Sequence, residues 1–487
     1  MTAMDQITDE TVALIRKAQT AGIVYADGVY GYDLSGVVSW VPVETPTRDR
    51  VTRRQAPVGS DAARWRTMLN INGSQPNPFT GQDGVGSDVN FQFHTMLSNY
   101  YPVRTRGHVT LDSIDASRGY DDVRARALAG TLMQWRIMDN KAIIGGQNWA
   151  LPALTLNATP LATATTGGQI AATTAVYVKV QARSGYNYYW GGSGAAVAAN
   201  ITTGSGSTNS VTINTWSNPG NAAVAYDIFA GPSAGTLYYV TTVTTNAAYT
   251  LTAIPVANAA VPALPSINAT VPTPAASDGS ASANSFNGLF ASVLGDYLST
   301  GVQATPGSGD LASGAYVKSL GGAALTANGQ AVNEIDAALQ SYFNNTGGLT
   351  PTTMLMSQAT SGVIKNLVLS TSAATTYLEP QGDSRVGVTV GGSVLRYIAP
   401  SGQSVEIVID PHFPQGRILF LRDSNPYPEA GQANNYEVRT LREVSENPLA
   451  NPYTSTPGEW WDVSSNQTFI NRAPVMNALI TDIGGGA

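Results

Sequence analysis

The chain has 487 residues, of which 43% are hydrophobic and only 12% are charged, so it can bury ordinary cores and is not a disordered polymer. It has no cysteine, which excludes disulfides, thiolate zinc sites and cysteine nucleophiles. The net charge is −7: residues 1–150 hold 15 basic and 15 acidic residues, residues 151–280 hold two of each, and the acidic excess lies after residue 280. This distribution is unlike that of a dedicated nucleic-acid binder, and it would suit head-to-tail association of copies.

The N-terminal region predicts a short helix and then an extended arm. Residues 7–22 place acidic residues first and Arg16 and Lys17 last, which is typical of a capped amphipathic helix and opposite to a secretory signal. No run approaches about 18 apolar residues, so we expect no membrane contact. The following segment is extended and carries four arginines, Arg48, Arg50, Arg53 and Arg54. They indicate either a solvated flexible arm or an arm lying across a neighbouring subunit's acidic face.

Residues 60–110 predict a long β-ribbon with a turn-rich tip. ARWRTMLNI and NFQFHTMLSNYYPVRTRGHVTL read as two strands on either side of NGSQPNPFTGQDGVGSD. Such a ribbon alone is marginally stable in water, so it needs a partner to lie on. The residues that we expect to contact a neighbouring subunit are Arg64, Trp65, Arg66, Arg104 and Arg106, together with the four arginines of the arm.

Residues 115–144 predict one long helix. Val123, Leu128, Leu132 and Trp135 recur at helical spacing, Asp121 and Asp122 lie near the start, and Gly145-Gly146 ends the pattern.

The composition then changes to Ala, Thr, Gly, Ser and Asn with almost no charge over residues 150–280. Strand patterns recur between turns: AVYVKVQA, SVTINTW, AVAYDIFAG, TLYYVTTV and AYTLTA. They predict an inserted all-β sandwich between linkers, and the segment resembles an immunoglobulin-like or fibronectin-type domain, although no cysteine pair supports this. Tyr186, Tyr188, Tyr189 and Trp190 are either core residues, which we favour, or exposed aromatics for weak glycan or cell-surface binding. The module could also clamp neighbouring subunits.

From residue 285 the pattern is α+β. Helices are predicted in SFNGLFASVLGDYL and GQAVNEIDAALQSYFNNTGG, and GVIKNLVLS is a helix or a strand. Strands are predicted in TPTTMLMS, RVGVTV and VLRYIA, and TFINRAPVMNALIT reads as a last strand. VEIVIDPHFPQGRILFLRDSN, residues 405–425, predicts a tight hairpin.

Catalytic motifs are weak. Gly231-Pro232-Ser233-Ala234-Gly235 matches G-x-S-x-G, but strands flank it on both sides, which favours a hairpin turn over a nucleophile elbow. Gly307–Ala312 fits G-x-G-x-x-A without a βαβ unit around it. The three histidines, His94, His108 and His412, do not form a metal-site spacing. We therefore predict no enzyme activity, no cofactor and no metal site.

The order of these parts resembles the major capsid proteins of tailed bacteriophages, which have the HK97-type fold. The most similar passages are GYDDVRARALAGTLMQWRIMDNKAIIGG, LTANGQAVNEIDAALQSYFNNTGGLTPTTMLMSQATSGVIKNL and the 405–425 segment. The resemblance implies an N-terminal arm (1–59), an E-loop ribbon (60–110), a spine helix of the peripheral domain (111–149), the inserted module (150–280), and an axial domain with the rest of the peripheral domain (281–487).

The resemblance also implies a function. Many copies would form hexamers and pentamers of an icosahedral virion shell around double-stranded DNA, with only weak DNA contact, after assembly in the bacterial cytoplasm. A portal, and possibly scaffolding or decoration proteins, would be partners. The alternative is another virion or cell-surface structural protein, such as a tail or adhesin component, but repeat-built adhesins lack the long helix.

Some relatives join their subunits covalently through an E-loop lysine. The lysines of this chain are at 17, 141, 179, 318 and 365, and none lies in 60–110. We therefore predict a shell that is held without isopeptide bonds or disulfides.

Overall fold

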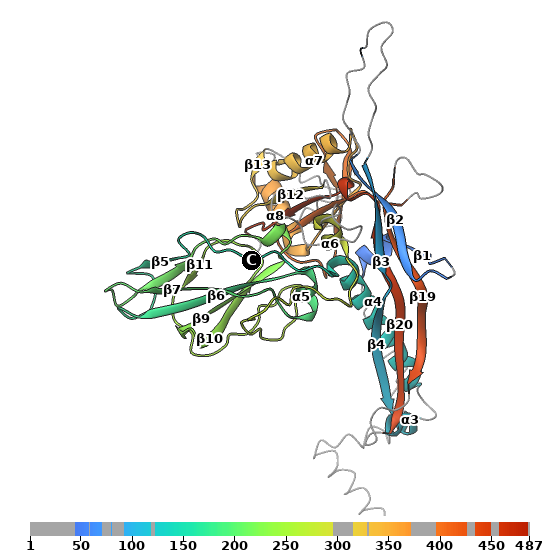
Figure 1. Ribbon diagram of the computed structural model, residues 1–487, viewed down its shortest axis with the longest axis horizontal. Helices are drawn as coiled ribbons and strands as arrows, with labels where there is room; N and C mark the ends of the chain where they lie inside the picture. Colours follow the sequence, from blue (N-terminus) through green and yellow to red (C-terminus); the bar gives the residue numbers. More distant parts are fainter. Residues whose placement is uncertain are drawn as a thin grey trace, which may run out of the picture. The chain divides into compact units, whose positions relative to one another are not determined.

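The computed structural model describes residues 44–57, 59–70, 79, 92–117, 122–295, 315–328, 331–371, 396–425, 434–449 and 457–485. The predicted helix at 7–22, the strand RVGVTV and the glycine motif at 307–312 lie outside the described residues. The α+β prediction is confirmed, because helices and mixed sheets occur together in what is described (Figure 1).

A four-stranded sheet lies against a long helix. Its order is β1 (Thr52–Gln55), β19 (Tyr436–Leu449), β20 (Gly458–Asn471) and β4 (Tyr101–Thr110). β1 runs parallel to β19 and the other pairs are antiparallel. Helix α4 (Val123–Gly145) packs along one face of the sheet, on β4 and β20.

The predicted single helix at 115–144 is two helices, α3 (Leu111–Ser117) and α4. The Asp122 side chain accepts a hydrogen bond from the backbone N–H of Ala125 at 3.0 Å, which caps α4 and explains the separate start. The helix ends at Gly145, and the N–H of Gly146 donates to the carbonyl of Ala142. Trp135 of the predicted apolar stripe is buried, whereas Leu132 is 42% exposed.

The helix approaches the sheet most closely at Gly107. A Cβ atom there would overlap the Thr131 hydroxyl and the Trp461 indole. Glycine at this position therefore lets β4 and α4 lie in contact.

The ribbon is shorter than predicted. Strands β2 (Ala62–Asn70) and β3 (Gln92–Asn99) pair in antiparallel fashion, as expected. The prediction that the second strand continues to 110 is wrong, because β4 begins at Tyr101 and pairs with β20 instead of β2. Val103 and Val109 of β4 pack in the cluster that Trp135, Trp461 and Val463 form, so burial of this face keeps β4 in the sheet. Arg104 and Arg106 consequently belong to the sheet and not to the ribbon.

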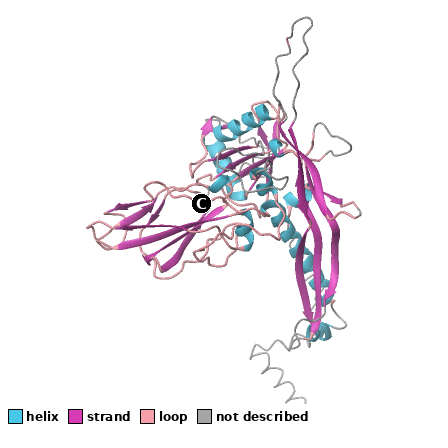
Figure 2. Ribbon diagram, in the orientation of Figure 1, coloured by secondary structure: helices cyan, strands magenta, loops and turns pink. Residues whose placement is uncertain are grey.

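The inserted segment forms two sheets that are separate from the others (Figure 2). One has the order β10 (Thr236–Val243), β9 (Ala225–Ser233), β6 (Ala175–Arg183), β7 (Val197–Thr202); the other has the order β11 (Tyr249–Leu251), β8 (Ser210–Ile213), β5 (Leu161–Ala164). The five predicted strands are confirmed. The sequence reading missed β5, which it assigned to a linker, β7, and the short helix α5 (Gly185–Trp190).

The ends of this segment meet, as in an insertion. The N–H of Leu151 donates to Ser280 Oγ at 2.8 Å, and the N–H of Ser282 donates to the carbonyl of Gln147 at 3.1 Å. We call residues 151–280 the β module. Tyr188 and Tyr189 are buried, which confirms the core reading for these two aromatics.

A six-stranded mixed sheet forms the remaining core. Its order is β12 (Tyr316–Ser319), β21 (Ala478–Thr481), β18 (Ile418–Leu421), β15 (Thr353–Met356), β17 (Ser404–Ile409), β16 (Arg396–Ile398). The other elements here are α6 (Leu289–Leu294), α7 (Asn333–Asn345), α8 (Gln358–Thr371), β13 (Ala327–Asn328) and β14 (Ala331–Val332). Leu355 packs toward the β module core, whereas Met354 and Met356 pack with α7. Both faces of the six-stranded sheet are therefore covered by other parts of the chain, which explains why its strands have continuous apolar sequences.

The predicted hairpin at 405–425 is wrong. β17 and β18 do not pair with each other, because β15 lies between them, parallel to β17 and antiparallel to β18. All four residues of β15 are buried, so insertion of this strand removes more apolar surface from water than a hairpin would. The predicted last strand is also divided, into the end of β20, a 3₁₀ turn at Pro474–Met476, and β21.

Replacement of Gly107 by Ala should destabilise the chain by about 1–3 kcal/mol, the usual cost of overpacking, because the new methyl group must displace Thr131 or Trp461. Urea denaturation of unassembled protein measures this. Gly235→Ala is the matched control: no atom lies within 4 Å of its Cβ position, so its midpoint should stay near that of the wild type. Equal midpoints for the two variants would contradict the close approach.

Candidate functional site

The described part of the predicted arm packs on its own chain. Helix α2 (Pro46–Arg50) contacts α4, and β1 adds to the edge of β19 in register Thr52↔Glu437 to Gln55↔Thr440. The predictions of a solvated arm and of an arm across a neighbouring subunit are therefore wrong for residues 46–55. The extended conformation was predicted correctly for 52–55, whose strand pairs with β19, but 46–50 form a helix instead. Residues 1–43 lie outside the described part.

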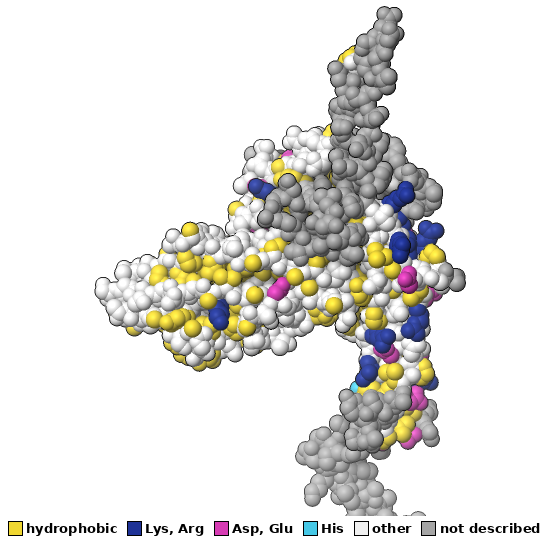
Figure 3. All heavy atoms as spheres, viewed as in Figure 1, with side chains coloured by type: hydrophobic (Ala, Val, Ile, Leu, Met, Phe, Trp, Pro, Cys, Tyr) yellow, Lys and Arg dark blue, Asp and Glu magenta, His cyan; other side chains and the backbone are white. Residues whose placement is uncertain are grey.

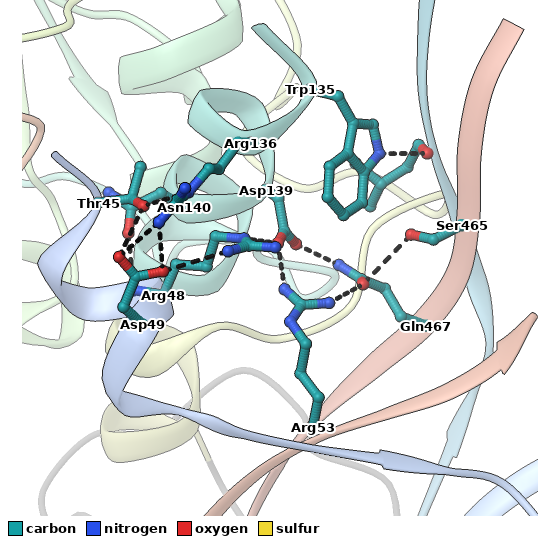
Figure 4. Close-up of polar contacts among 11 residues, drawn as sticks. Thr45, Arg48, Asp49, Arg53, Trp135, Arg136, Asp139, Asn140, Ser465 and Gln467 are labelled. Carbon is teal, nitrogen blue, oxygen red and sulfur yellow. Dashed lines mark hydrogen bonds and ion pairs between the residues drawn. The ribbon is translucent and has the colours of Figure 1, made fainter. Parts of the chain in front are cut away.

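A buried carboxylate, Asp139 of α4, holds this segment (Figure 4). Arg48 Nε donates to Asp139 Oδ2 at 2.8 Å, and Arg53 Nη2 donates to the same oxygen. Gln467 Nε2 of β20 donates to Oδ1 at 2.5 Å. One carboxylate thus connects the arm segment, the long helix and the sheet.

The two guanidinium groups of this network also lie over an aromatic ring. The Arg48 and Arg53 Cζ atoms are 5.6 and 5.9 Å from the centroid of Trp135, within the range of cation–π attraction. Burial lowers the pKa of Arg53, and Asp139 acts in the opposite direction. Arginine stays protonated in proteins, so the network contains two cations and one buried anion.

A second buried carboxylate, Asp410, lies in the segment that was predicted as a hairpin turn. Its Oδ2 accepts from the Thr47 hydroxyl at 2.6 Å and from Asn140 Nδ2 at 3.1 Å. Asn140 Oδ1 in turn accepts from the backbone N–H of Arg48 at 2.9 Å. The sequence reading did not identify Asp139, Asn140 or Asp410. The sequence pattern that could have identified them is a polar residue next to an apolar run. Such a residue is often buried with that run and then needs hydrogen-bond partners.

Outer ion pairs complete the attachment of the arm. Arg136 Nη2 lies 2.9 and 2.8 Å from the two carboxylate oxygens of Asp49, and Arg136 Nε donates to Thr45 Oγ1 (Figure 4). Arg50 Nη2 donates to Glu406 Oε2 at 2.6 Å. Solvent screens these pairs, so each contributes less than the contacts of Asp139.

The predicted contact residues thus divide into two groups. Arg48, Arg50 and Arg53 bind acidic groups of their own chain. The others, except Trp65, are exposed, and only Arg104 approaches an acidic group in the described part of the chain, Asp462 at 4.0 Å. The exposed members, which we call the arginine face, are Arg54, Arg64, Arg66, Arg104 and Arg106.

The strand positions place the sheet members of the arginine face on the side away from α4. Thr105 Oγ1 contacts Met138 Sδ of α4 at 3.2 Å, so its neighbours Arg104 and Arg106 point to the opposite side. Arg53 points to α4 and Arg54 therefore points away. Figure 3 shows Lys and Arg side chains over this sheet, with Asp and Glu side chains between them.

The ribbon lies on the same side of the sheet. Gln467 points to Asp139, so Thr468 points away from α4, and its hydroxyl is 2.7 Å from Ser98 of β3. Trp65 is half-buried, and its Nε1 donates to the carbonyl of Asn471 at 3.1 Å. The ribbon base is therefore anchored, while Arg64 and Arg66 are exposed.

The motif that resembles a serine hydrolase is a hairpin turn, as predicted. β9 ends at Ser233 and β10 begins at Thr236, whose N–H donates to Ser233 Oγ. His108 stacks on Trp460 and His412 contacts Ser266. Among the described residues, no group of three or more His, Asp or Glu is arranged to hold a metal. The helices described there also lack the length and apolar content that a membrane span needs.

Replacement of Asp139 by Asn should lower the free energy of unfolding by about 3 kcal/mol, the lower end of the cost of breaking a buried ion pair, because two cations lose their anion. Denaturation of unassembled protein measures the change. Asp462→Asn is the control, since its pair with exposed Arg104 is long and should contribute less than about 1 kcal/mol. Similar losses in both variants would contradict a dominant role for Asp139.

The chain was compared with known proteins. Residues 266–451 match the sequence model of the SU10 major capsid protein family. No curated protein matches the chain. Solved structures that resemble it are the capsid of a native GTA particle (8% identity, 96% of this chain and 99% of that chain, TM-score 0.44), the cyanophage A-1(L) capsid (11%, 92% and 95%, 0.44) and Mycobacterium phage Bobi (9%, 94% and 95%, 0.38).

The identification rests on the family match, because the TM-scores are below 0.5. The matched segment includes α7, α8, the β15–β18 strands and all of β19. Over residues 266–451 the chain is therefore similar to the SU10 major capsid protein, a capsid-forming protein.

Proposed function

We propose that copies of this chain join into hexamers and pentamers of an icosahedral head shell that encloses double-stranded DNA, and that the arginine face binds a neighbouring subunit. The observation that carries this proposal is the exposed arginine face. Four of its five guanidinium groups make no ion pair with another described residue. A capsid protein that repeats such a surface in every copy can use it in every contact of a closed lattice.

The charge distribution favours a contact between unlike surfaces. The arginine face comes from residues 54–106, whereas the acidic excess of the chain lies after residue 280. A basic surface of one copy that meets an acidic surface of the next gives a head-to-tail contact, which closes into a ring when the rotation allows it. Complementary charge also directs the encounter of subunits.

The ribbon supports the same proposal. Among the ribbon side chains that the structure describes, Ala63 and Met96 are the buried apolar ones, and Trp65 packs against Met96, so these strands have only a small core of their own. Two strands without a core are marginally stable in water. A neighbouring subunit that covers β2 and β3 would supply the missing burial.

The shell would be held without covalent cross-links. No lysine lies in 60–110 and the chain has no cysteine. Contact with packaged DNA would be weak and dependent on salt. In this proposal the chain has the HK97-type division into arm, ribbon, spine helix, peripheral and axial domains, and the β module is an immunoglobulin-like insertion. Assembly would take place in the bacterial cytoplasm, with a portal as a partner and scaffolding or decoration proteins as further candidates.

A tail or adhesin component is the alternative function. The long helix α4 and the family match both favour the capsid role. The structural family also indicates a non-enzymatic role.

Simultaneous replacement of Arg64, Arg66 and Arg106 by Ala should reduce shell assembly at least tenfold, because three unpaired cations of the proposed contact are lost. Negative-stain particle counts measure assembly, and thermal unfolding of unassembled protein should change little. The control replaces Lys179, Lys318 and Lys365 by Ala, which removes the same charge from other surfaces. Wild-type particle yield from the arginine variant would sink this role for the arginine face.

Purified shells that are boiled in denaturing detergent should migrate as single chains, because the ribbon lacks the lysine that an isopeptide bond needs. Gel electrophoresis with and without reductant tests this. A ladder of covalent oligomers under both conditions would disprove the non-covalent shell without changing the family assignment.

A further inference from the structure

His412 lies where the β module meets the six-stranded sheet. Its Nδ1 is 2.6 Å from Ser266 Oγ, in the segment that returns from the module. Its backbone carbonyl accepts a hydrogen bond from the Tyr189 hydroxyl of α5 at 2.8 Å. His412, which follows β17, therefore makes both of these hydrogen bonds to the β module.

The turn itself is fixed from the other side. The backbone N–H of His412 donates to Asp410 Oδ1 at 2.8 Å, and Asp410 is completely buried among Thr47 and Asn140. Because Asp410 is held by the arm segment and by α4, the histidine ring has a rigid support on the capsid body. A change in the charge of the ring therefore affects its contact with the module more than its contact with the capsid body.

One ring nitrogen has no hydrogen-bond partner among the described residues. His412 Nε2 is buried and unpaired. A neutral imidazole carries a single N–H group. If this group is at Nδ1, it donates to Ser266 Oγ, and Nε2 is then an unprotonated acceptor without a partner. A second proton would place an N–H donor at that nitrogen without an acceptor, and a buried unpaired donor is costly.

The charges around the ring have opposite effects. Burial lowers the pKa of His412; Asp410 raises it and Lys141 of α4 lowers it. Lys141 lies over the Tyr189 ring, 6.0 Å from its centroid, and burial lowers its own pKa. Arg417, which is buried, acts on the Tyr189 hydroxyl and adds further positive charge to this region. A cationic His412 would thus face one other cation, Lys141, and one carboxylate, Asp410.

We propose that His412 is an acid-sensitive latch between the β module and the capsid body: the neutral ring holds Ser266 in place, and protonation, which puts an unpaired N–H at the buried Nε2, releases it. Since burial lowers the pKa of the closed state below that of an exposed histidine, the opened joint binds more protons. The latch is therefore fully effective above the ordinary histidine pKa of about 6.5 and weakens as the pH falls below it.

The opening is local, because other contacts between module and body do not involve the histidine. Arg417 Nη1 donates to the carbonyl of Val224 at 2.7 Å, and Asn218 Nδ2 donates to Asp482 Oδ2 at 2.6 Å. These contacts keep β9 and the preceding turn attached to β18 and β21. The segment that opens is the return segment around Ser266, whereas the contact of the Tyr189 hydroxyl with the backbone carbonyl of His412 stays.

Hydrogen exchange of the full-length protein tests the latch. The N–H of Asn268 donates to the carbonyl of Tyr188 at 2.8 Å, so peptides that cover 262–270 report whether the joint is closed. After correction for the intrinsic pH dependence of exchange, wild-type protection in these peptides should fall about threefold to tenfold between pH 7.5 and 5.0. Peptides that cover β21 should show no such fall.

Two histidine variants separate this latch from general acid sensitivity. His412→Gln stays neutral and should show no acid-dependent loss of protection at 262–270. His108→Gln, at an exposed histidine, should keep the wild-type response. Equal losses in wild type and His412→Gln, or no loss in the wild type down to pH 5.0, would overturn the proposal.

A third variant decides the matter if His412→Gln does not fold. Ser266→Ala keeps the histidine and removes its Nδ1 partner, so the acid-dependent loss should begin at higher pH than in the wild type. An unchanged pH profile in Ser266→Ala would also overturn the latch. None of these outcomes depends on shell assembly, so they are distinguishable from failure of the proposed capsid contacts.

Discussion

Buried carboxylates organise this chain, and most of its long-range architecture depends on them. Asp139 gathers two arginines of the arm segment and a glutamine of β20, while Asp410 gathers Thr47, Asn140 and the following turn. A carboxylate away from water is tolerated only when both of its oxygens accept hydrogen bonds or ion pairs. Each of the two carboxylates therefore specifies which segments of the chain must meet. The long helix α4 carries Asp139 and Asn140 side by side and thus links the four-stranded sheet to the six-stranded one.

Local elements were largely predictable from the sequence, because their signals are local. Helical spacing identified α7, glycine ended α4, and alternating strands separated by turns identified five strands of the β module. The break between α3 and α4 was missed, although Asp122 is a favoured capping residue. The strand β5 was missed because a four-residue Thr- and Ala-rich strand resembles a linker in composition.

Pairings between distant segments could not be predicted from one sequence. β17 and β18 are joined by a short turn of the kind that favours a hairpin, yet β15 comes between them because its four residues, three of them apolar, are all buried there. The arginine cluster at 48–54 was recognised, but its partners lie 86 to 91 residues away at Asp139 and more than 300 residues away at Glu406. Charge alone shows that a partner is needed and does not show whether it belongs to the same chain.

The position of β21 affects the order in which the protein can fold during its synthesis. β21 pairs with both β12 and β18, so the six-stranded sheet stays divided until residues 478–481 have left the ribosome. The β module has no such dependence within its two sheets, and its strands are available some 200 residues earlier. A nascent chain therefore carries a folded module next to an unfinished core, and the body of the protein can join a growing lattice only after residues 478–481 have emerged.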